Sequence, residues 1–280
     1  MTLRSLLFVP GDRPDRMEKA LRLDADALIL DLEDSVALEA KATARKMTAE
    51  FLRSAKRRQK LFVRLNPLDS GLLGKDLEAL KDVAPDAFVL PKAEGEASIE
   101  ALAVRAPAIP VLPIATETPA AVFELGSYRS VRHLILGLTW GAEDLPAAIG
   151  AISSREEDGR YTPPYEMLRS LTLFGAHAAG VEAIETVYPA FRDLDGLSAY
   201  ARRARRDGFT GMMAIHPGQL PVINAAFTPT AEELAQAQAI VDAFSANPGL
   251  GVLSFAGRMI DKPHLKQARR LLGLAEKQSP

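Results

Sequence analysis

Short apolar runs alternate with longer amphipathic stretches along this chain. Each run is short, rich in Val, Ile and Leu, and ends in Pro, Gly or polar residues, which is typical of strands buried on both faces. Eight runs fit this description: 5–10, 27–33, 61–66, 87–92, 110–117, 133–140, 181–188 and 211–216. The stretches between them carry Ala, Leu, Glu, Lys and Arg at helical spacing, as at 37–55 and 198–208. Eight strands alternating with helices predict an α/β fold of the (β/α)8 TIM-barrel type.

An open doubly wound sheet is the main alternative to a barrel. The first run is followed by PGDRPDR in place of GxGxxG, and GxxxxGK[ST] does not occur, so neither nucleotide-binding motif favours the open sheet. We therefore expect a TIM-barrel catalytic domain over residues 1–246. The tail at 247–280 exceeds a minimal barrel, and we expect a C-terminal helical extension that packs on a neighbouring subunit. The long irregular stretch 153–164 follows the sixth run, where barrels often carry part of a lid.

Composition narrows the functional classes. Lys and Arg number 34 against 36 Asp and Glu, and this balance gives no basic surplus for binding nucleic acid or an anionic membrane. Cysteine is absent, which excludes disulfides, thiolate metal sites and thiol nucleophiles. No apolar run is long enough to span a membrane, and the N-terminal residues do not resemble a signal peptide. We therefore expect a cytoplasmic protein with a small-molecule substrate.

Polar residues gather where the predicted strands end, which is where TIM barrels carry their active sites. They are Asp31, Glu33, Asp34, Arg64, Asn66, Lys92, Thr116, Glu117, Thr118, Glu143, Asp144, Glu185 and His216. Carboxylates that converge without thiolates or a His cluster suit a hard cation such as Mg²⁺. Glu117 and Asp144 follow neighbouring strands, so both could reach one ion. The alternative is that such acids cap the following helices, as Asp144 could.

The cationic residues at the strand ends allow several roles. Arg64 lies in an otherwise apolar strand and needs a partner, which could be a substrate carboxylate or enolate, or Asp31 or Glu33 in a structural pair. Lys92 could form a Schiff base, as in an aldolase, or could pair with neighbouring carboxylates. His216 could act as a base or as a hydrogen-bonded structural group.

Motifs along almost the whole chain resemble one family. They are LLFVPGDRPDRMEKA near the start, LILDLEDSV followed by Lys41 and Arg45, VRLNP at 63–67, LPKAE at 90–94, ATETPAAV at 115–122, GAEDL at 141–145, AIHPGQ at 214–219 and GRMIDKP at 257–263. In these motifs the chain resembles the citrate lyase β-subunit (CitE-like) family of the HpcH/HpaI aldolase superfamily.

The resemblance implies a TIM barrel with Mg²⁺ bound by Glu117 and Asp144, and Arg64 in contact with substrate oxygens. It also implies homotrimers or hexamers in which segment 257–263 reaches the site of an adjacent subunit, so that Asp261 acts in trans. Glu185 stands where relatives often carry Asp, and no direct role is assigned to it.

The chemistry that the resemblance implies is a reversible Claisen-type cleavage. A 3-hydroxyacyl thioester of the citramalyl-CoA or malyl-CoA type gives a 2-oxo acid and acetyl-CoA or another acyl-CoA. Mg²⁺ would assist loss of the 3-hydroxyl proton. Arg64 would stabilise the enolate oxygen and Asp261 would move the proton at the enolate carbon.

Five further residues have expected supporting roles. Glu33 and Asp34 would orient metal-bound waters or Arg64. Arg16 and Lys19, together with the nearby Arg13, could meet the phosphates of coenzyme A.

Three other functions remain open on the sequence. The protein could be the β-subunit of a citrate lyase complex that cleaves citryl bound to an acyl-carrier protein. It could be an aldolase that uses Lys92 as a Schiff base, or a non-catalytic barrel that binds acyl-CoA.

Overall fold

The computed structural model describes residues 3–106 and 109–278. The chain divides into two compact units, Leu3–Asn224 and a C-terminal unit that begins at Ala225. The division falls inside the helix α9 (Leu220–Phe227).

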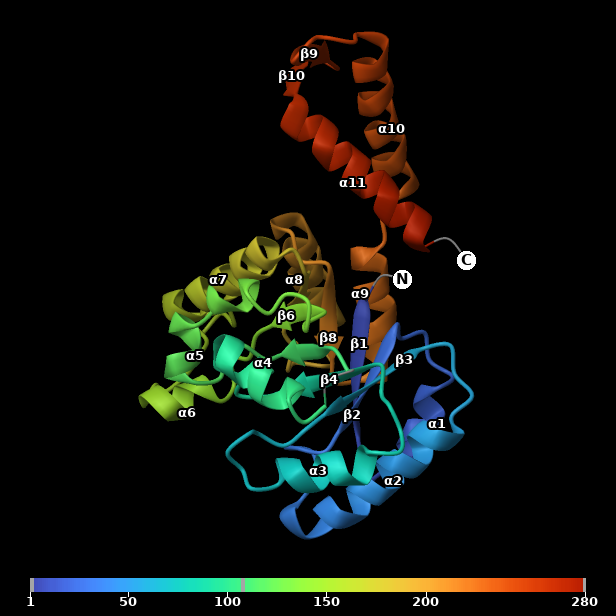
Figure 1. The fold of residues 1–280 in the computed structure, drawn as a ribbon. Coiled ribbons are helices and arrows are strands. Elements are labelled where there is room, and N and C mark those ends of the chain that lie inside the picture. Colours follow the sequence, from blue (N-terminus) through green and yellow to red (C-terminus); the bar gives the residue numbers. More distant parts are fainter. Residues whose placement is uncertain (1–2, 107–108, 279–280) are drawn as a thin grey trace. The chain divides into compact units, whose positions relative to one another are not determined.

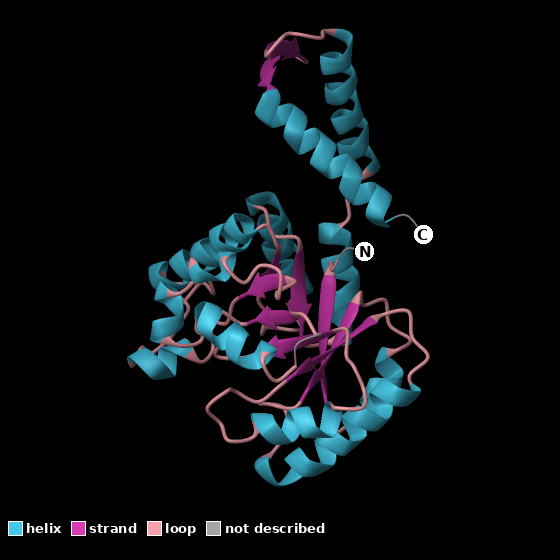
Figure 2. Cartoon of the chain, in the orientation of Figure 1, coloured by secondary structure: helices cyan, strands magenta, loops and turns pink. Residues whose placement is uncertain are grey.

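Eight parallel strands form the first unit (Figure 1, Figure 2). They are β1 (Ser5–Pro10), β2 (Ala27–Asp31), β3 (Lys60–Arg64), β4 (Ala87–Leu90), β5 (Val111–Pro113), β6 (Gly137–Thr139), β7 (Glu182–Glu185) and β8 (Gly211–Ala214). Their order is β5-β4-β3-β2-β1-β8-β7-β6. Parallel bridges Val111–Ile135 and Ile114–Thr139 join the two ends of this sheet. The predicted TIM barrel is confirmed.

Helices and short 3-10 turns follow the strands around the barrel (Figure 1). The helices are α1 (Pro14–Ala20), α2 (Lys41–Ser54), α3 (Leu73–Leu80), α4 (Gly95–Ala103), α5 (Pro119–Phe123), α6 (Leu145–Ile149), α7 (Pro163–Ala179) and α8 (Leu194–Asp207). The 3-10 turns are η1 (Leu38–Ala40), η2 (Ser127–Arg129) and η3 (Pro217–Gln219). Helices α7 and α8 both end at a left-handed glycine, Gly180 and Gly208, which lacks the Cβ that disfavours this conformation.

Most strands are shorter than the apolar runs that predict them, although β1 has the same bounds as its run. The runs at 110–117 and 133–140 contain strands of three residues each, β5 and β6. The polar ends of the runs leave the strand ladder and form the loops between each strand and its helix. Glu117 and Asp144 therefore lie on loops that follow β5 and β6.

Alternation along β2 and β3 carries the apolar barrel core into a charged pair. Ala27, Ile29 and Phe62 belong to the buried apolar cluster of the barrel. Because side chains two residues apart share a face, Asp31 continues the row of Ile29, and Arg64 continues the row of Phe62. The strand register places Asp31 directly opposite Arg64. The core thus ends in an acid and a base at the carboxyl ends of two adjacent strands.

The C-terminal unit contains two helices and a hairpin. Its elements are α10 (Ala231–Ala246), β9 (Val252–Phe255), β10 (Arg258–Asp261) and α11 (Lys262–Gln278). The two strands pair antiparallel, and α10 packs against α11. The predicted boundary lies after residue 246, at the end of α10, whereas the compact C-terminal unit begins at Ala225 and includes α10. Contact of this unit with a neighbouring subunit stays a prediction.

No helix among the described residues has the length and apolarity needed to cross a membrane.

The pairing of β1 with β8 predicts that Gly211 tolerates no side chain. A Cβ at Gly211 would lie 1.7 Å from the backbone oxygen of Leu3. We expect Gly211→Ala to lower the free energy of unfolding by about 3 kcal/mol, the upper part of the range for overpacked interiors. Urea unfolding measures this difference. Gly74→Ala is the control, since a Cβ at Gly74 meets nothing within 4 Å, and equal stability of the two variants would contradict the prediction.

Candidate active site

Arg64 is held at the end of β3 by three carboxyl groups. Its Nε and Nη2 donate to Asp31 Oδ1 and Oδ2, both at 2.7 Å, in a two-point ion pair. Its Nη1 lies 3.0 Å from Glu33 Oε2 and 3.4 Å from Asp34 Oδ2. The guanidinium carbon lies 4.8 Å from the centre of the Phe8 ring. This arrangement locks the guanidinium in one orientation.

Charge keeps Arg64 protonated. Burial alone would lower the pKa of the guanidinium, but the hydrogen bonds and charge of Asp31, with the charge of Glu33, raise it above its ordinary value. Asp31 responds in the opposite sense: burial would raise its pKa, but Arg64 holds it below the ordinary value. The pair is therefore ionised at neutral pH.

Lys92 connects this ion pair to the loops after β5 and β6. Its Nζ donates to Glu33 Oε1 at 2.9 Å and lies 3.4 Å from Asp144 Oδ1. Glu33 therefore touches Arg64 through one oxygen and Lys92 through the other. The charged side chains are therefore joined in one continuous series, which runs from Arg64 through Glu33 and Lys92 to Asp144.

The backbone of Lys92 takes a conformation that is rare for residues other than glycine. Its φ is 51°, in the left-handed region. In this conformation the Lys92 N–H donates to Glu117 Oε2 at 2.7 Å. Strain of this kind persists only where the surrounding structure imposes it, and it is common at functional sites.

Glu117 and Asp144 both face Lys92. Glu117 is buried and packs against Gly141, where an added Cβ would lie 2.9 Å from Glu117 Cγ. Burial, with a contribution from the charge of Asp144, raises the pKa of Glu117 to about 8. Asp144 stands at the N-cap of α6, but its carboxylate accepts no hydrogen bond there and lies near Lys92 Nζ. The Asp144 side chain therefore does not cap α6.

The donor chemistry of this cluster fits a hard divalent cation. Five carboxyl groups surround Arg64 and Lys92: Asp31, Glu33, Asp34, Glu117 and Asp144. The carboxyl groups outnumber the two cations, so the cluster carries an excess of acid. Within the described residues no group of three or more metal-ligating side chains assembles. Two carboxylates are sufficient for Mg²⁺, because Mg²⁺ usually takes only one or two ligands from the protein and completes its coordination with water and substrate oxygens.

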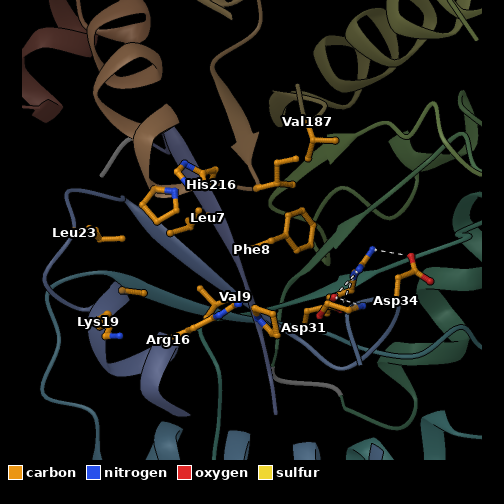
Figure 3. A pocket seen from close by; sticks show the side chains of 16 residues that line it. Leu7, Phe8, Val9, Arg16, Lys19, Leu23, Asp31, Asp34, Val187 and His216 are labelled. Carbon is orange, nitrogen blue, oxygen red and sulfur yellow. Dashed lines mark hydrogen bonds and ion pairs between the residues drawn. The ribbon is translucent and has the colours of Figure 1, made fainter. Parts of the chain in front are cut away.

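A cavity of about 710 Å³ opens beside Arg64 (Figure 3). Asp31, Asp34 and Arg64 line it, with Phe8 as an apolar wall. Arg16 and Lys19 of α1 also line the cavity and are exposed. Figure 3 shows these two cations across the view from Asp34. The cavity thus runs from the charged cluster to a basic rim.

His216 lines the same cavity from the loop after β8. Its Nδ1 accepts a hydrogen bond from the Gly218 N–H at 3.0 Å, and its ring stacks on Phe191 at 5.1 Å between centroids. The side chain caps η3, as the structural alternative for this residue expects.

Buried groups beneath the site hold the turn after β2. Lys41 Nζ donates to the carbonyl oxygens of Leu32 and Glu33 at 2.6 and 2.7 Å. Asn66 Nδ2 also donates to Leu32 O, and Asp76 accepts from both the backbone and the side chain of Asn66. These bonds fix the backbone from which Glu33 and Asp34 project.

Some predicted site residues lie away from the cluster. Glu185 is fully buried and pairs with Arg169 at 2.7 Å, away from the cavity lining. Asp261 belongs to the C-terminal unit, where its Oδ1 lies 2.5 Å from His264 Nδ1. That hydrogen bond lowers the pKa of Asp261 below its ordinary value. Arg13 is exposed and pairs with Asp15.

Sequence reasoning missed the central position of Lys92. The strand-end pattern marks the residue, but nothing in the sequence indicates that its ammonium joins Glu33 to Asp144 or that its own N–H holds Glu117. A left-handed backbone is expected at glycine, and a lysine gives no local signal for it.

Comparison with known proteins decides the family. The family model for HpcH/HpaI aldolase/citrate lyase matches residues 4–217. The chain belongs to this family. Membership confirms the family resemblance seen in the sequence, and it makes the protein an enzyme of a family that contains carbon–carbon lyases.

Relatives in the HpcH/HpaI aldolase/citrate lyase family align over nearly the full chain. A citrate lyase subunit beta-like protein from Mycobacterium tuberculosis is 36% identical, with 95% of this chain and 93% of the relative covered. A (3S)-malyl-CoA thioesterase from Cereibacter sphaeroides is 34% identical, with 98% and 94% covered. A mitochondrial citramalyl-CoA lyase from Rattus norvegicus is 33% identical, with 97% and 86% covered.

A solved structure of the family superimposes on the chain. CitE from Mycobacterium tuberculosis, crystallised with magnesium, acetoacetate and coenzyme A, gives a TM-score of 0.86 at 34% identity. The alignment covers 98% of each chain.

The surroundings of Lys92 disfavour a Schiff base. A lysine nucleophile needs a lowered pKa so that its amine is neutral. Burial would lower the pKa of Lys92, but its hydrogen bond to Glu33 and the charges of Glu33, Glu117 and Asp144 raise it above the ordinary value.

We therefore predict that borohydride in the presence of pyruvate leaves Lys92 unmodified at neutral pH, because its ammonium stays protonated. Peptide mass spectrometry measures the adduct, and an aldolase known to form a Schiff base serves as the positive control. A reduced pyruvate adduct mapped to Lys92 would overturn this view of the site.

Proposed function

We propose that the protein is a Mg²⁺-dependent acyl-CoA lyase that cleaves a 3-hydroxyacyl thioester of the citramalyl-CoA or malyl-CoA type. The products are a 2-oxo acid and acetyl-CoA or another acyl-CoA, and the reaction is reversible. One observation carries the proposal: Arg64, locked by Asp31, lines a cavity of about 710 Å³ and also contacts Glu33, which Lys92 links to Asp144.

The proposed reaction breaks one carbon–carbon bond and needs no further reactant. The 3-hydroxyl loses its proton as the oxygen becomes the carbonyl of the 2-oxo acid. The electron pair of the bond between the hydroxyl-bearing carbon and the carbon next to the thioester moves to form a thioester enolate. A proton then adds to the enolate carbon, so atoms and charge balance.

Arg64 is suited to binding an oxygen that carries negative charge during this step. Its position costs no reorganisation, because Asp31 and Glu33 already fix the guanidinium. Asp34 also contacts Arg64 from the exposed side. We assign Glu33 and Asp34 to orienting Arg64 and the waters near it.

Glu117 and Asp144 are the residues that would hold Mg²⁺. The ion would supply Lewis-acid stabilisation to the oxygen that loses its proton. The CitE structure contains magnesium, which supports Mg²⁺ as the cation. Lys92 would keep the two carboxylates in place through its backbone N–H and its ammonium.

Arg16 and Lys19 are suited to the phosphates of a coenzyme A thioester, because they form the basic rim of the cavity that begins at Arg64. The CitE structure also contains coenzyme A. Asp261 is assigned to the proton at the enolate carbon, supplied by another copy of the chain in a trimer or hexamer.

A panel of 3-hydroxyacyl-CoA thioesters, with citramalyl-CoA and malyl-CoA included, tests the proposal. We expect equal amounts of 2-oxo acid and acyl-CoA, formed with Mg²⁺ and lost after chelation. Release of free coenzyme A without a 2-oxo acid would indicate a thioesterase, and cleavage only of acyl-carrier-bound citryl would indicate a citrate lyase subunit. Either result would overturn the proposed reaction.

The metal ligands are tested with Glu117→Gln and Asp144→Asn. Each removes one negative oxygen, and we expect loss of Mg²⁺-dependent cleavage with an unchanged circular dichroism spectrum. Glu143→Gln is the matched control, because Glu143 is adjacent to Asp144 but exposed. Full Mg²⁺-dependent activity in either ligand variant would remove that residue from the metal site.

Complementation tests whether sites are shared between copies. Arg64→Ala should lower kcat by about 10²–10³-fold, as loss of an oxyanion donor does, and Asp261→Asn should also be inactive. Mixed oligomers of the two variants should regain part of the activity, because some sites then combine an intact Arg64 with an intact Asp261. Absence of any gain in oligomers shown to be mixed would mean that one chain makes the whole site.

A further inference from the structure

The chain has one tryptophan, and its indole contacts the buried ion pair of Glu185 and Arg169. Trp140 directly follows β6 and is fully buried. Its Nε1–H donates to Glu185 Oε1 at 2.5 Å. Thr139 of β6 pairs with Ile184 of β7, so the next residue on each strand brings Trp140 beside Glu185.

Glu185 is fixed by several donors that the proposed reaction does not use. Its Oε1 also accepts from the Thr186 N–H at 2.9 Å, and its Oε2 accepts from Arg169 Nε at 2.7 Å. Arg169 donates in turn to Asp207 at 2.8 Å. Glu185 and Arg169 are almost completely buried. A buried ion pair is weak evidence for a contribution to stability, because apolar residues often replace such pairs without loss of stability. The hydrogen bond from the Trp140 indole to Glu185 indicates instead that the ion pair holds the indole in place.

The other side of Trp140 leads directly to Glu117 and Asp144. The Gly141 N–H donates to Thr116 Oγ1 at 3.1 Å, and the same hydroxyl donates to Gly141 O at 3.0 Å. Gly141 packs so closely on Glu117 that a Cβ would lie 2.9 Å from its Cγ. Asp144 follows three residues later. The backbone at Gly141 therefore connects the contact with Glu117 to the segment that carries Asp144.

We propose that Glu185, held by Arg169, is a positioning residue for the cation site, acting through the Trp140 indole to fix Gly141 and thereby Asp144 relative to Glu117. This inference rests on the proposed function, because it takes Glu117 and Asp144 as the Mg²⁺ ligands. Tyr161 supports the same indole, with ring centroids 5.0 Å apart, and it belongs to the stretch after α6. That stretch is thus anchored on Trp140.

The test measures Mg²⁺ binding to the full chain by calorimetry and by the emission of Trp140. In the wild-type protein, Mg²⁺ should change the emission, with the midpoint that calorimetry gives. Glu185→Gln keeps the shape of the side chain but loses the charge that orders Arg169 and the indole. We expect its Mg²⁺ affinity to fall about tenfold, the lower end for groups that orient metal ligands, and its emission maximum to shift before Mg²⁺ is added.

Asp26→Asn is the matched control. Asp26 pairs with Arg4 at 2.8 Å just before β2, at the amino ends of the strands. The substitution makes the same chemical change in an ion pair far from the cluster along the strands. We expect its Mg²⁺ affinity and Trp140 emission to equal those of the wild type, so that a general loss of stability is distinguished from a loss of position.

A second variant keeps the proposal testable if Glu185→Gln does not fold. Trp140→Phe keeps an aromatic ring against Tyr161 but removes the N–H donor, and calorimetry should show weaker Mg²⁺ binding. Mg²⁺ affinity within twofold of wild type in either folded variant would overturn the positioning role. Failure of the proposed function would give a different result. Either the wild-type protein would bind no Mg²⁺, or Glu117→Gln would bind Mg²⁺ as tightly as the wild type does. In both cases the proposed metal site, and with it the positioning role of Glu185, would be wrong.

Discussion

Asp31 and Arg64 meet at the carboxyl ends of β2 and β3, and the other site residues are arranged around this ion pair. Two parallel hydrogen bonds fix the guanidinium, and the strand register makes the two residues direct neighbours. A charged group in this position would be costly without a partner, because the residues below it form the apolar barrel core. The pair satisfies that requirement and leaves one edge of Arg64 beside the cavity.

Charge balance divides the strand ends into two regions. Around Lys92, the carboxyl groups of Glu33, Glu117 and Asp144 outnumber the cations. Around Glu185, the acid is matched by Arg169 and by neutral donors, so no further cation is required. A region with excess acid can accept a metal ion, whereas a balanced one can only hold neighbouring groups in place. Trp140 and Gly141 connect the two regions, because Trp140 contacts Glu185 and the adjacent Gly141 packs against Glu117.

Much of this arrangement could be predicted from the sequence. Short apolar runs mark all eight strands, and the polar residues at their ends include Arg64, Glu33, Asp34, Glu117 and Asp144. The contacts among these residues could not be predicted, since they come from strands and loops that are far apart in the chain. The left-handed backbone of Lys92 has no local signal, because tertiary contacts impose it on an ordinary residue. The partnership of Trp140 with Glu185 depends on the pairing of β6 with β7.

The sequence by itself therefore determined the number and kind of elements and the chemical groups at their ends, because hydrophobic periodicity and residue type are local properties. The tertiary structure alone decided which of those groups touch. Closure of the barrel between β5 and β6 and the register of each strand pair set the distances between side chains that are far apart in the chain. Those distances turn a series of separate acids into one cluster around Lys92, because electrostatic interaction and metal coordination both depend on a few ångströms of separation.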